Sequence, residues 1–279
     1  MWFLNLRSVK RRMPFSIAVL HGGLAQDLRV PRFNCFERAI SLRNAMKSSP
    51  ANIRFAVLET PISKELVRRV PDLDGRVSVL PHPLPTDLMF HEPVEEKDKK
   101  DAVHVGLLGL CTPQKGLFRF LRLAKYAHDN GVSGVRFEIV GRLHEDSVSA
   151  ARPFMNYLWR QPSADRVPRH EFVRSVSILD YGAFLFEGNH YEMTASGVLL
   201  DCVGLGVPLV KSENILFRSL EAEVGKIGLT LPEEPEAAIR QIMEDSNESY
   251  RLMRENIMAL RGCRGGEATG QRIRDILGL

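Results

Sequence analysis

The residues best suited to chemistry lie in the stretch 181–213, which reads YGAFLFEGNHYEMTASGVLLDCVGLGVPLVKSE. An apolar run gives way to a polar loop, then Ser196 and Gly197 open an apolar helix that closes at Gly206 before a new strand. In a parallel sheet, ligands lie beyond the carboxyl ends of the strands, so this loop is expected at the mouth of a site. A helix that begins there offers N–H groups to an anion, and Ser196 as N-cap leaves donors unused. The stretch predicts a turn that faces a phosphate.

A second segment, VHVGLLGLCTPQKGLFRF, places a cation in a similar position. An apolar strand ends at the glycine-flanked run from Gly106 to Gly109, and a helix begins near Gly116 with its apolar face at Leu117, Phe120, Leu121 and Ala124. Lys115 directly precedes that helix, where an ammonium group reaches a phosphate that the N–H groups also hold. The alternative, a solvated loop lysine, stays open for this motif taken by itself.

The segment ASGVLLDCVGLGVPLV resembles the donor-site segment of GT-B glycosyltransferases, specifically those of glycosyltransferase family 4. In that family an acidic residue precedes SGVLL, a second acid and G-V-P-V-V, and the segment holds the ribose and phosphates of a nucleotide sugar. The resemblance puts Asp201 at the second acidic position, as a ligand of ribose hydroxyls. The first acidic position falls on Met193, and the nearest carboxylate is Glu192. A solvated helix residue is the alternative for Asp201.

The resemblance extends to the segment around Lys115. The family form G-x-L-x-x-x-K-G is usually accompanied by an arginine, but this chain carries Leu110 at the arginine position. The resemblance implies that Gly106, Gly109 and Lys115 bind the donor, and that Gly141, at the end of the next strand VRFEIVGR, approaches the nucleotide. It also implies that one of two usual diphosphate cations is absent.

Upstream, strands and helices alternate from Phe15: SIAVLHG, a long helical segment over 32–49, IRFAVLE, ISKELVRRV and RVSVLPHPL. These are βα units of a parallel sheet. They resemble the second half of a GT-B acceptor domain, in which the strand-end histidine, here His21, contacts the transferred sugar. An ordinary turn residue before Gly22 and Gly23 is the alternative. The usual glycine after the closing strand is absent from Val79-Leu80-Pro81-His82-Pro83.

These patterns predict an α/β fold of two Rossmann-like parallel-sheet domains, the first of them incomplete. The expected parts are a partial acceptor-side domain (1–87), a charged linker (88–101), a nucleotide-sugar-binding domain (102–262) and a C-terminal helix (263–279). Several βα units that precede the strand at Ser16 in the family have no counterpart in the first residues of this chain.

The composition is that of a globular protein: 279 residues, 44% hydrophobic and 26% charged. The four cysteines form no CxxC pair, so reduced thiols and a cytoplasmic location are expected. The N-terminal segment has no signal-peptide pattern, and no apolar run of about 18 residues is long enough to span a membrane.

Residues 1–86 are basic, with 14 Lys and Arg against 6 Asp and Glu. This charge indicates an anionic partner, either a charged acceptor or the inner face of a membrane, which the protein would contact peripherally. Nucleic acid is not expected, because no aromatic and basic recognition motif accompanies the charge.

Two other chemistries are disfavoured. Asp72-Leu73-Asp74 matches the metal-binding D-x-D of GT-A glycosyltransferases, yet PDLDG between a helix and a strand is ordinary turn chemistry. The glycines at 106, 109 and 116 have the wrong spacing for the dinucleotide fingerprint, so no NAD enzyme is expected. We predict no cofactor and no metal.

The sequence therefore predicts transfer of a sugar from a nucleotide-diphosphate sugar to a saccharide or lipid-linked acceptor, as in polysaccharide biosynthesis. The resemblance implies retention of configuration without metal. Lys115 and the amides near Ser196 and Gly197 would converge on one diphosphate, because a leaving group of this charge needs cations or helix N-termini. Two alternatives remain: a non-catalytic or partner-dependent glycosyltransferase-like subunit, and an unrelated α/β binding protein or sugar-nucleotide epimerase.

Overall fold

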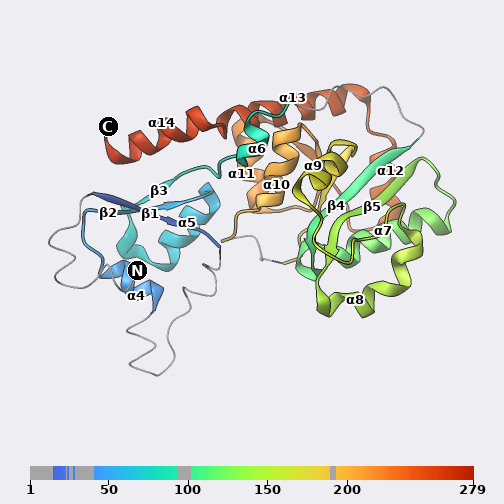
Figure 1. Ribbon diagram of the computed structural model, residues 1–279, viewed down its shortest axis with the longest axis horizontal. Helices are drawn as coiled ribbons and strands as arrows, with labels where there is room; N and C mark the ends of the chain where they lie inside the picture. The colour runs from blue at the N-terminus through green and yellow to red at the C-terminus, as the bar shows by residue number, and fades with distance from the viewer. Residues whose placement is uncertain (1–14, 23, 25–27, 29–40, 93–101, 189–192) are drawn as a thin grey trace. The chain divides into compact units, whose positions relative to one another are not determined.

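A computed structural model describes residues 15–22, 24, 28, 41–92, 102–188 and 193–279. The chain forms two compact units. The first unit comprises Met1–Pro83, Tyr191–Ser196 and Cys263–Leu279, and the second comprises Leu84–His190 and Gly197–Gly262. Each contains a parallel sheet (Figure 1). The predicted α/β class with two parallel-sheet units is confirmed, and the first sheet is the smaller one.

The sheet of the first unit has the order β1-β2-β3, with all strands parallel. In the register Ala18 lies opposite Phe55, and Val57 lies opposite Val79. The described elements are β1 (Ser16–Leu20), α4 (Leu42–Lys47), β2 (Ile53–Val57), α5 (Thr60–Arg69), the short 3₁₀ turn η2 (Pro71–Leu73) and β3 (Val77–Val79). They follow the alternation predicted from the sequence. Most of the long helix predicted over 32–49 lies outside the described residues, which contain its last part as α4.

The C-terminal helix α14 (Gly266–Leu277) belongs to the first unit. It begins at Gly266, within the range 263–279 that the sequence predicts for a C-terminal helix. Before it, the buried guanidinium group of Arg264 lies 3.2 Å from the buried carboxylate of Glu59 at the start of α5. Arg272 of α14 donates from Nε to the carbonyl oxygen of Val79, at 3.0 Å. These contacts join the C-terminal segment to the first sheet.

The sheet of the second unit has the order β5-β4-β6-β7-β8 and is parallel throughout. Its strands are β4 (Val103–Cys111), β5 (Val135–Leu143), β6 (Tyr181–Phe184), β7 (Leu209–Lys211) and β8 (Gly228–Thr230). The chain places its second strand on one side of the first and all later strands on the other. This reversal makes the carboxyl ends of β4 and β6 the topological switch point, which is where open α/β sheets bind ligands.

Helices cover this sheet as their apolar faces require. They are α6 (Thr86–Met89), α7 (Leu117–Asp129), α8 (Glu145–Ala151), α9 (Arg169–Ser177), α10 (Gly197–Leu205), α11 (Ile215–Val224), α12 (Pro235–Met243) and α13 (Asn247–Cys263), with 3₁₀ turns η3 (Pro113–Lys115) and η4 (Arg152–Tyr157). The predicted apolar face of α7 is buried, and α9 likewise buries Phe172, Val173 and Val176. Among the described residues, no helix combines the length and apolar character that a membrane crossing requires.

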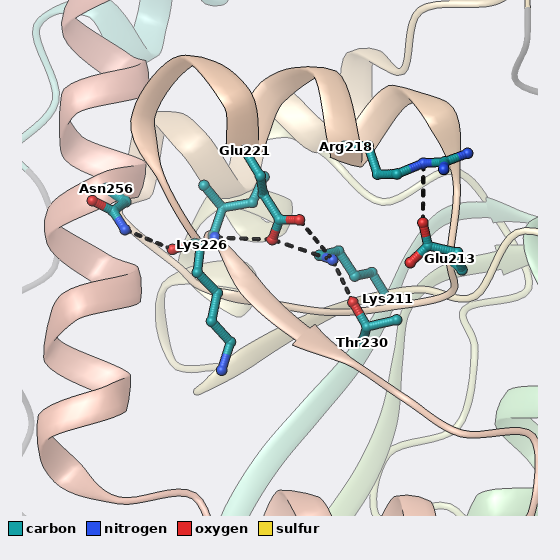
Figure 2. A network of polar contacts seen from close by, with 8 residues as sticks. Lys211, Glu213, Arg218, Glu221, Lys226, Thr230 and Asn256 are labelled. Atoms are coloured by element: carbon teal, nitrogen blue, oxygen red, sulfur yellow. Dashed lines mark hydrogen bonds and ion pairs between the residues drawn. The ribbon is translucent and has the colours of Figure 1, made fainter.

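An ion pair that involves a buried lysine stabilises the edge of this sheet formed by β7 and β8 (Figure 2). Lys211 ends β7 and is 2% exposed, and its Nζ lies 3.2 Å from the carboxylate of Glu221 on α11. The same Nζ lies 2.6 Å from Oγ1 of Thr230 on β8. Because an unpaired buried ammonium is costly, the contact with Glu221 ties β7 to α11, and the hydrogen bond to Thr230 ties β7 to β8.

Candidate functional site

The loop between β4 and α7 holds Lys115 in a tight turn. Oγ1 of Thr112 accepts a hydrogen bond from the backbone N–H of Lys115, at 3.3 Å. The turn ends at Gly116, whose φ of 82° is accessible to glycine at little cost, and α7 begins with the next residue. The helix start predicted near Gly116 is confirmed.

This loop packs against the segment that follows β6. A Cβ atom on Gly116 would lie 2.0 Å from the carbonyl oxygen of Leu185, so a side chain is excluded there. The carbonyl oxygen of Gln114 accepts a hydrogen bond from the N–H of Glu187, at 3.0 Å. Lys115 is therefore positioned at the switch point between the carboxyl ends of β4 and β6.

The ammonium group of Lys115 is half-buried. Burial lowers its pKa, and the nearby Cys111 opposes this shift weakly. Within the described part of the chain, no carboxylate pairs with its Nζ and no side-chain hydrogen bond reaches it. A partly desolvated cation without a carboxylate partner, at the ligand-binding edge of a sheet, is typical of a site that binds an anion.

The first turn of α10 lies beside the end of β4. A Cβ atom on Gly109, which has a φ of 75°, would lie 3.0 Å from a methyl group of Val198. A Cβ atom on Gly197 would meet no atom within 4 Å, so packing does not require a glycine at this position. Ser196 directly precedes the helix, is 9% exposed and is grouped with the first unit.

The other glycines have different roles. Gly141 has a φ of 148°, and a Cβ there would lie 2.0 Å from the carbonyl oxygen of Gly109, so neighbouring strands β4 and β5 meet backbone to backbone. The strand continues past Gly141 to Leu143. Gly106 lies inside β4, where a Cβ would be 2.4 Å from Cδ1 of Leu179. Packing against Leu179 is by itself a sufficient reason for a glycine at position 106.

A pocket of about 360 Å³ opens at the carboxyl ends of β4 and β5. Its lining contains both glycines of this edge, three arginines and three apolar residues: Gly109, Leu110, Gly141, Arg142, Arg166, Val167, Arg169 and Phe172. The backbone N–H of Ser163 donates to the carbonyl oxygen of Gly141, at 2.7 Å, and this bond brings the loop before α9 to the pocket. Such a lining suits an anionic ligand with an apolar part.

Sequence reasoning missed the three arginines. Arg142 is the penultimate residue of β5, and Arg166 and Arg169 lie at the start of α9, where the helix dipole disfavours cations. Basic residues at the start of a helix could have revealed this site in the sequence, because they indicate a negatively charged partner. The sequence pattern did not indicate that the two segments meet.

Asp201 lies on α10 but is not solvated, because it is 5% exposed. Its Oδ1 lies 2.7 Å from Nη1 of Arg169. Burial raises the pKa of Asp201 to about 6, with Arg169 acting to lower it and Asp87 to raise it. The solvated-helix alternative is thus wrong for Asp201. Its carboxylate contacts an arginine of the pocket.

The site residues predicted in or near the first unit differ in their exposure. His21 is exposed at the end of β1, and its ring lies 5.7 Å from that of His82 in an edge-on arrangement. Burial lowers the pKa of His82. Met193 is 1% exposed and packs in the apolar core of this unit. Glu192 lies outside the described residues.

The D-x-D segment forms a turn. Asp72 pairs with Lys47 at 2.5 Å, and Oδ1 of Asp74 accepts a hydrogen bond from the N–H of Gly75 at 3.0 Å, where φ is 69°. Within the described ranges, no cluster of three His, Cys, Asp or Glu side chains is arranged to hold a metal ion.

Comparison with solved structures identifies the fold. The chain is similar to WaaG, a glycosyltransferase involved in lipopolysaccharide biosynthesis, at 12% identity over 91% of this chain and 71% of that chain, with a TM-score of 0.57. It is also similar to an α,α-trehalose-phosphate synthase (UDP-forming) from Burkholderia vietnamiensis, at 13% identity over 98% and 69%, with a TM-score of 0.61. No protein-family model and no curated protein matches.

These similarities show that the chain has the GT-B fold, as the resemblance of its motifs predicted. At identities of 12% and 13% they establish the fold alone, and the chemistry has to be inferred from the residues of this chain.

Proposed function

We propose that this protein transfers a sugar from a nucleotide-diphosphate sugar to a saccharide or lipid-linked acceptor. The observation that carries the proposal is the half-buried Lys115, which has no carboxylate partner among the described residues and lies at the switch point of the second sheet. The solved structures of similar fold that are named above are glycosyltransferases, which favours this class of reaction.

In this proposal the second unit binds the donor. Lys115 and the leading N–H groups of α10 hold the diphosphate, and Gly109 and Gly141 let the nucleotide approach the backbone. The leaving nucleoside diphosphate develops negative charge as the sugar departs. Fixed cations and helix amides stabilise that charge without reorganising, so they lower the barrier. We propose that no metal is needed for this step.

The acceptor side belongs to the first unit. His21 is exposed at a strand end, as a residue that touches the transferred sugar must be. We propose transfer with retention, which the motif resemblance implies. A cytoplasmic enzyme whose basic first unit contacts an anionic membrane fits a lipid-linked acceptor of polysaccharide biosynthesis.

A non-catalytic or partner-dependent subunit is the second candidate. The position at which the family carries its first acidic residue holds Met193, which is buried in the core of the first unit. Leu110 occupies the position of a usual donor cation, and the described first sheet contains three strands. Such a subunit would bind nucleotide without turnover.

A panel of nucleotides and nucleotide sugars in a thermal-shift assay tests the proposal, followed by an assay for release of the nucleoside diphosphate. Lys115→Ala should abolish the shift, and Lys125→Ala, on the exposed face of α7, should preserve it. Binding with turnover in the presence of EDTA supports the enzyme, and binding without turnover supports the subunit. If no nucleotide raises the melting temperature of the wild-type protein, both candidates fail.

A further inference from the structure

Arg169 occupies an unfavourable place for a cation. It is the first residue of α9 and follows Pro168, at the end of the helix where the dipole is positive. Arg166 lies three residues earlier and lines the same pocket. The local sequence therefore concentrates positive charge where an isolated helix would favour negative charge. This arrangement needs negative partners.

Two carboxylates hold the guanidinium group of Arg169 from one side. Its Nε lies 2.7 Å from Oδ2 of Asp87, and its Nη2 lies 3.3 Å from Oδ1 of the same residue. Its Nη1 lies 2.7 Å from Oδ1 of Asp201. A guanidinium has five N–H donors, and the two hydrogen bonds to Asp87 use one on Nε and one on Nη2, so both terminal nitrogens keep a donor for another acceptor. The side chain is 43% exposed and lines the pocket, so these donors are accessible to a ligand.

Asp201 lies behind the arginine rather than in the pocket. It is 5% exposed, and among the described residues its Oδ1 has no aligned hydrogen-bond donor even though Nη1 of Arg169 is close. The contact is therefore an attraction between charges. Burying a carboxylate in this way costs free energy. A residue so enclosed can orient Arg169 but is poorly placed to bind the ribose.

The pocket in front of Arg169 is strongly positive. Arg142 and Arg166 line it, and no carboxylate is among its described lining residues. Neither arginine forms an ion pair with a described residue. Leu110, 37% exposed, contributes an apolar wall. An occupant that matches this lining carries negative charge.

We propose that Arg169, oriented by Asp87 and Asp201, binds a phosphate of the nucleotide donor together with Arg142 and Arg166, and that Asp201 is a positioning residue rather than a ribose ligand. This inference rests on the proposed nucleotide-sugar function and deepens it. It supplies from α9 the cation that Leu110 does not provide.

The test measures dissociation constants by calorimetry for UDP, GDP and ADP, for their nucleosides and for inorganic diphosphate. The variants are Arg169→Gln and Asp201→Asn, and the matched control is Arg174→Gln, which makes the same change at an exposed position of the same helix. Arg169→Gln should weaken binding of the nucleoside diphosphate about tenfold, as expected for a lost charge-assisted hydrogen bond, without changing nucleoside binding. Arg174→Gln should leave both affinities unchanged.

Asp201→Asn should also weaken binding of the diphosphate selectively. It should add no further loss in an Arg169→Gln background, because both changes disrupt the same pair of Arg169 and Asp201. Arg169→Lys, which keeps the charge, should restore part of the affinity. Equal loss of nucleoside and diphosphate affinity in Asp201→Asn would instead indicate a ribose ligand and overturn the positioning role.

The result for Lys115 separates this inference from the function on which it rests. If Lys115→Ala weakens nucleotide binding and Arg169→Gln behaves like Arg174→Gln, the role of Arg169 is wrong and the donor site stands. If the wild-type protein binds neither nucleotides nor inorganic diphosphate, both are wrong. Circular dichroism spectra of each variant verify the fold, and Arg169→Lys serves if Arg169→Gln does not fold.

Discussion

The Cα of Gly116 lies so close to the carbonyl group of Leu185 that a Cβ atom added to Gly116 would stand 2.0 Å from the carbonyl oxygen. This contact joins the loop that carries Lys115 to the segment after β6. It sets the geometry at the switch point of the second sheet.

Gly116→Ala should therefore destabilise the protein strongly. The clash with a backbone atom adds to the cost of placing a residue with a side chain at a φ of 82°, which by itself is about 1–2 kcal/mol. Gly131→Ala is the matched control, because Gly131 has a φ of 65° and a Cβ there would meet no atom within 4 Å. Urea denaturation should show the larger loss for Gly116→Ala. Equal losses would contradict the close approach to Leu185.

Lys115→Met should stabilise the folded protein while it removes nucleotide binding. The ammonium is partly desolvated without a carboxylate partner among the described residues, and an apolar side chain of similar length avoids that cost. We expect an increase in the free energy of unfolding of up to about 1 kcal/mol. The measurement is chemical denaturation without ligand. A clear loss of stability would indicate that Lys115 has a structural role.

Glu221→Gln should destabilise the protein because it leaves the buried charge of Lys211 without its partner (Figure 2). Removing one member of a buried ion pair costs about 3 kcal/mol. The control is Glu213→Gln. Glu213 and its partner Arg218 are both more than half exposed, so this change should cost less than about 1 kcal/mol. Thermal and urea unfolding of both variants would check this. Similar losses for the two would contradict the burial of Lys211.

Asp201 should make stability depend on pH in an unusual direction. Burial raises its pKa to about 6, whereas an unfolded chain has about 3.9 for aspartate. The folded protein retains a proton that the unfolded chain releases, so this residue's contribution falls as pH rises between these two values, by up to about 3 kcal/mol.

The measurement compares urea denaturation of the wild-type protein and Asp201→Asn at several pH values. The stability of the wild type relative to the variant should decrease between about pH 4 and about pH 6 and stay constant above about pH 7. Other carboxylates affect both proteins equally, so their contributions cancel in the comparison. Glu65 is an example of the opposite effect, because its hydrogen bonds with Arg68 and Arg69 lower its pKa to about 2. Parallel stability curves would show that the pKa of Asp201 is not raised.

Local pattern was enough to predict the framework of the site. Apolar runs and glycines located β4 and β5, and the helical periodicity after Gly116 located α7. These features are set by residues close in the chain, which is why spacing reveals them. The placement of Lys115 between β4 and α7 followed from the same signals.

Long-range contacts explain what the sequence did not reveal. The loop before α9 reaches the pocket through a hydrogen bond from Ser163 to Gly141, and Arg169 meets Asp87 from a helix 82 residues away in the chain. The burial of Asp201 depends on these neighbours. Gly106 resembled part of a ligand loop, but the need for a small residue there also comes from a long-range contact, with Leu179.

The most direct test of the central claim is the affinity of the purified protein for a nucleoside diphosphate, measured by calorimetry for the wild type, Lys115→Ala and Lys125→Ala. A donor site at the switch point predicts measurable binding that Lys115→Ala weakens about tenfold or more, and that Lys125→Ala leaves unchanged. Equal affinity of all three proteins would contradict the assignment of Lys115 to the diphosphate.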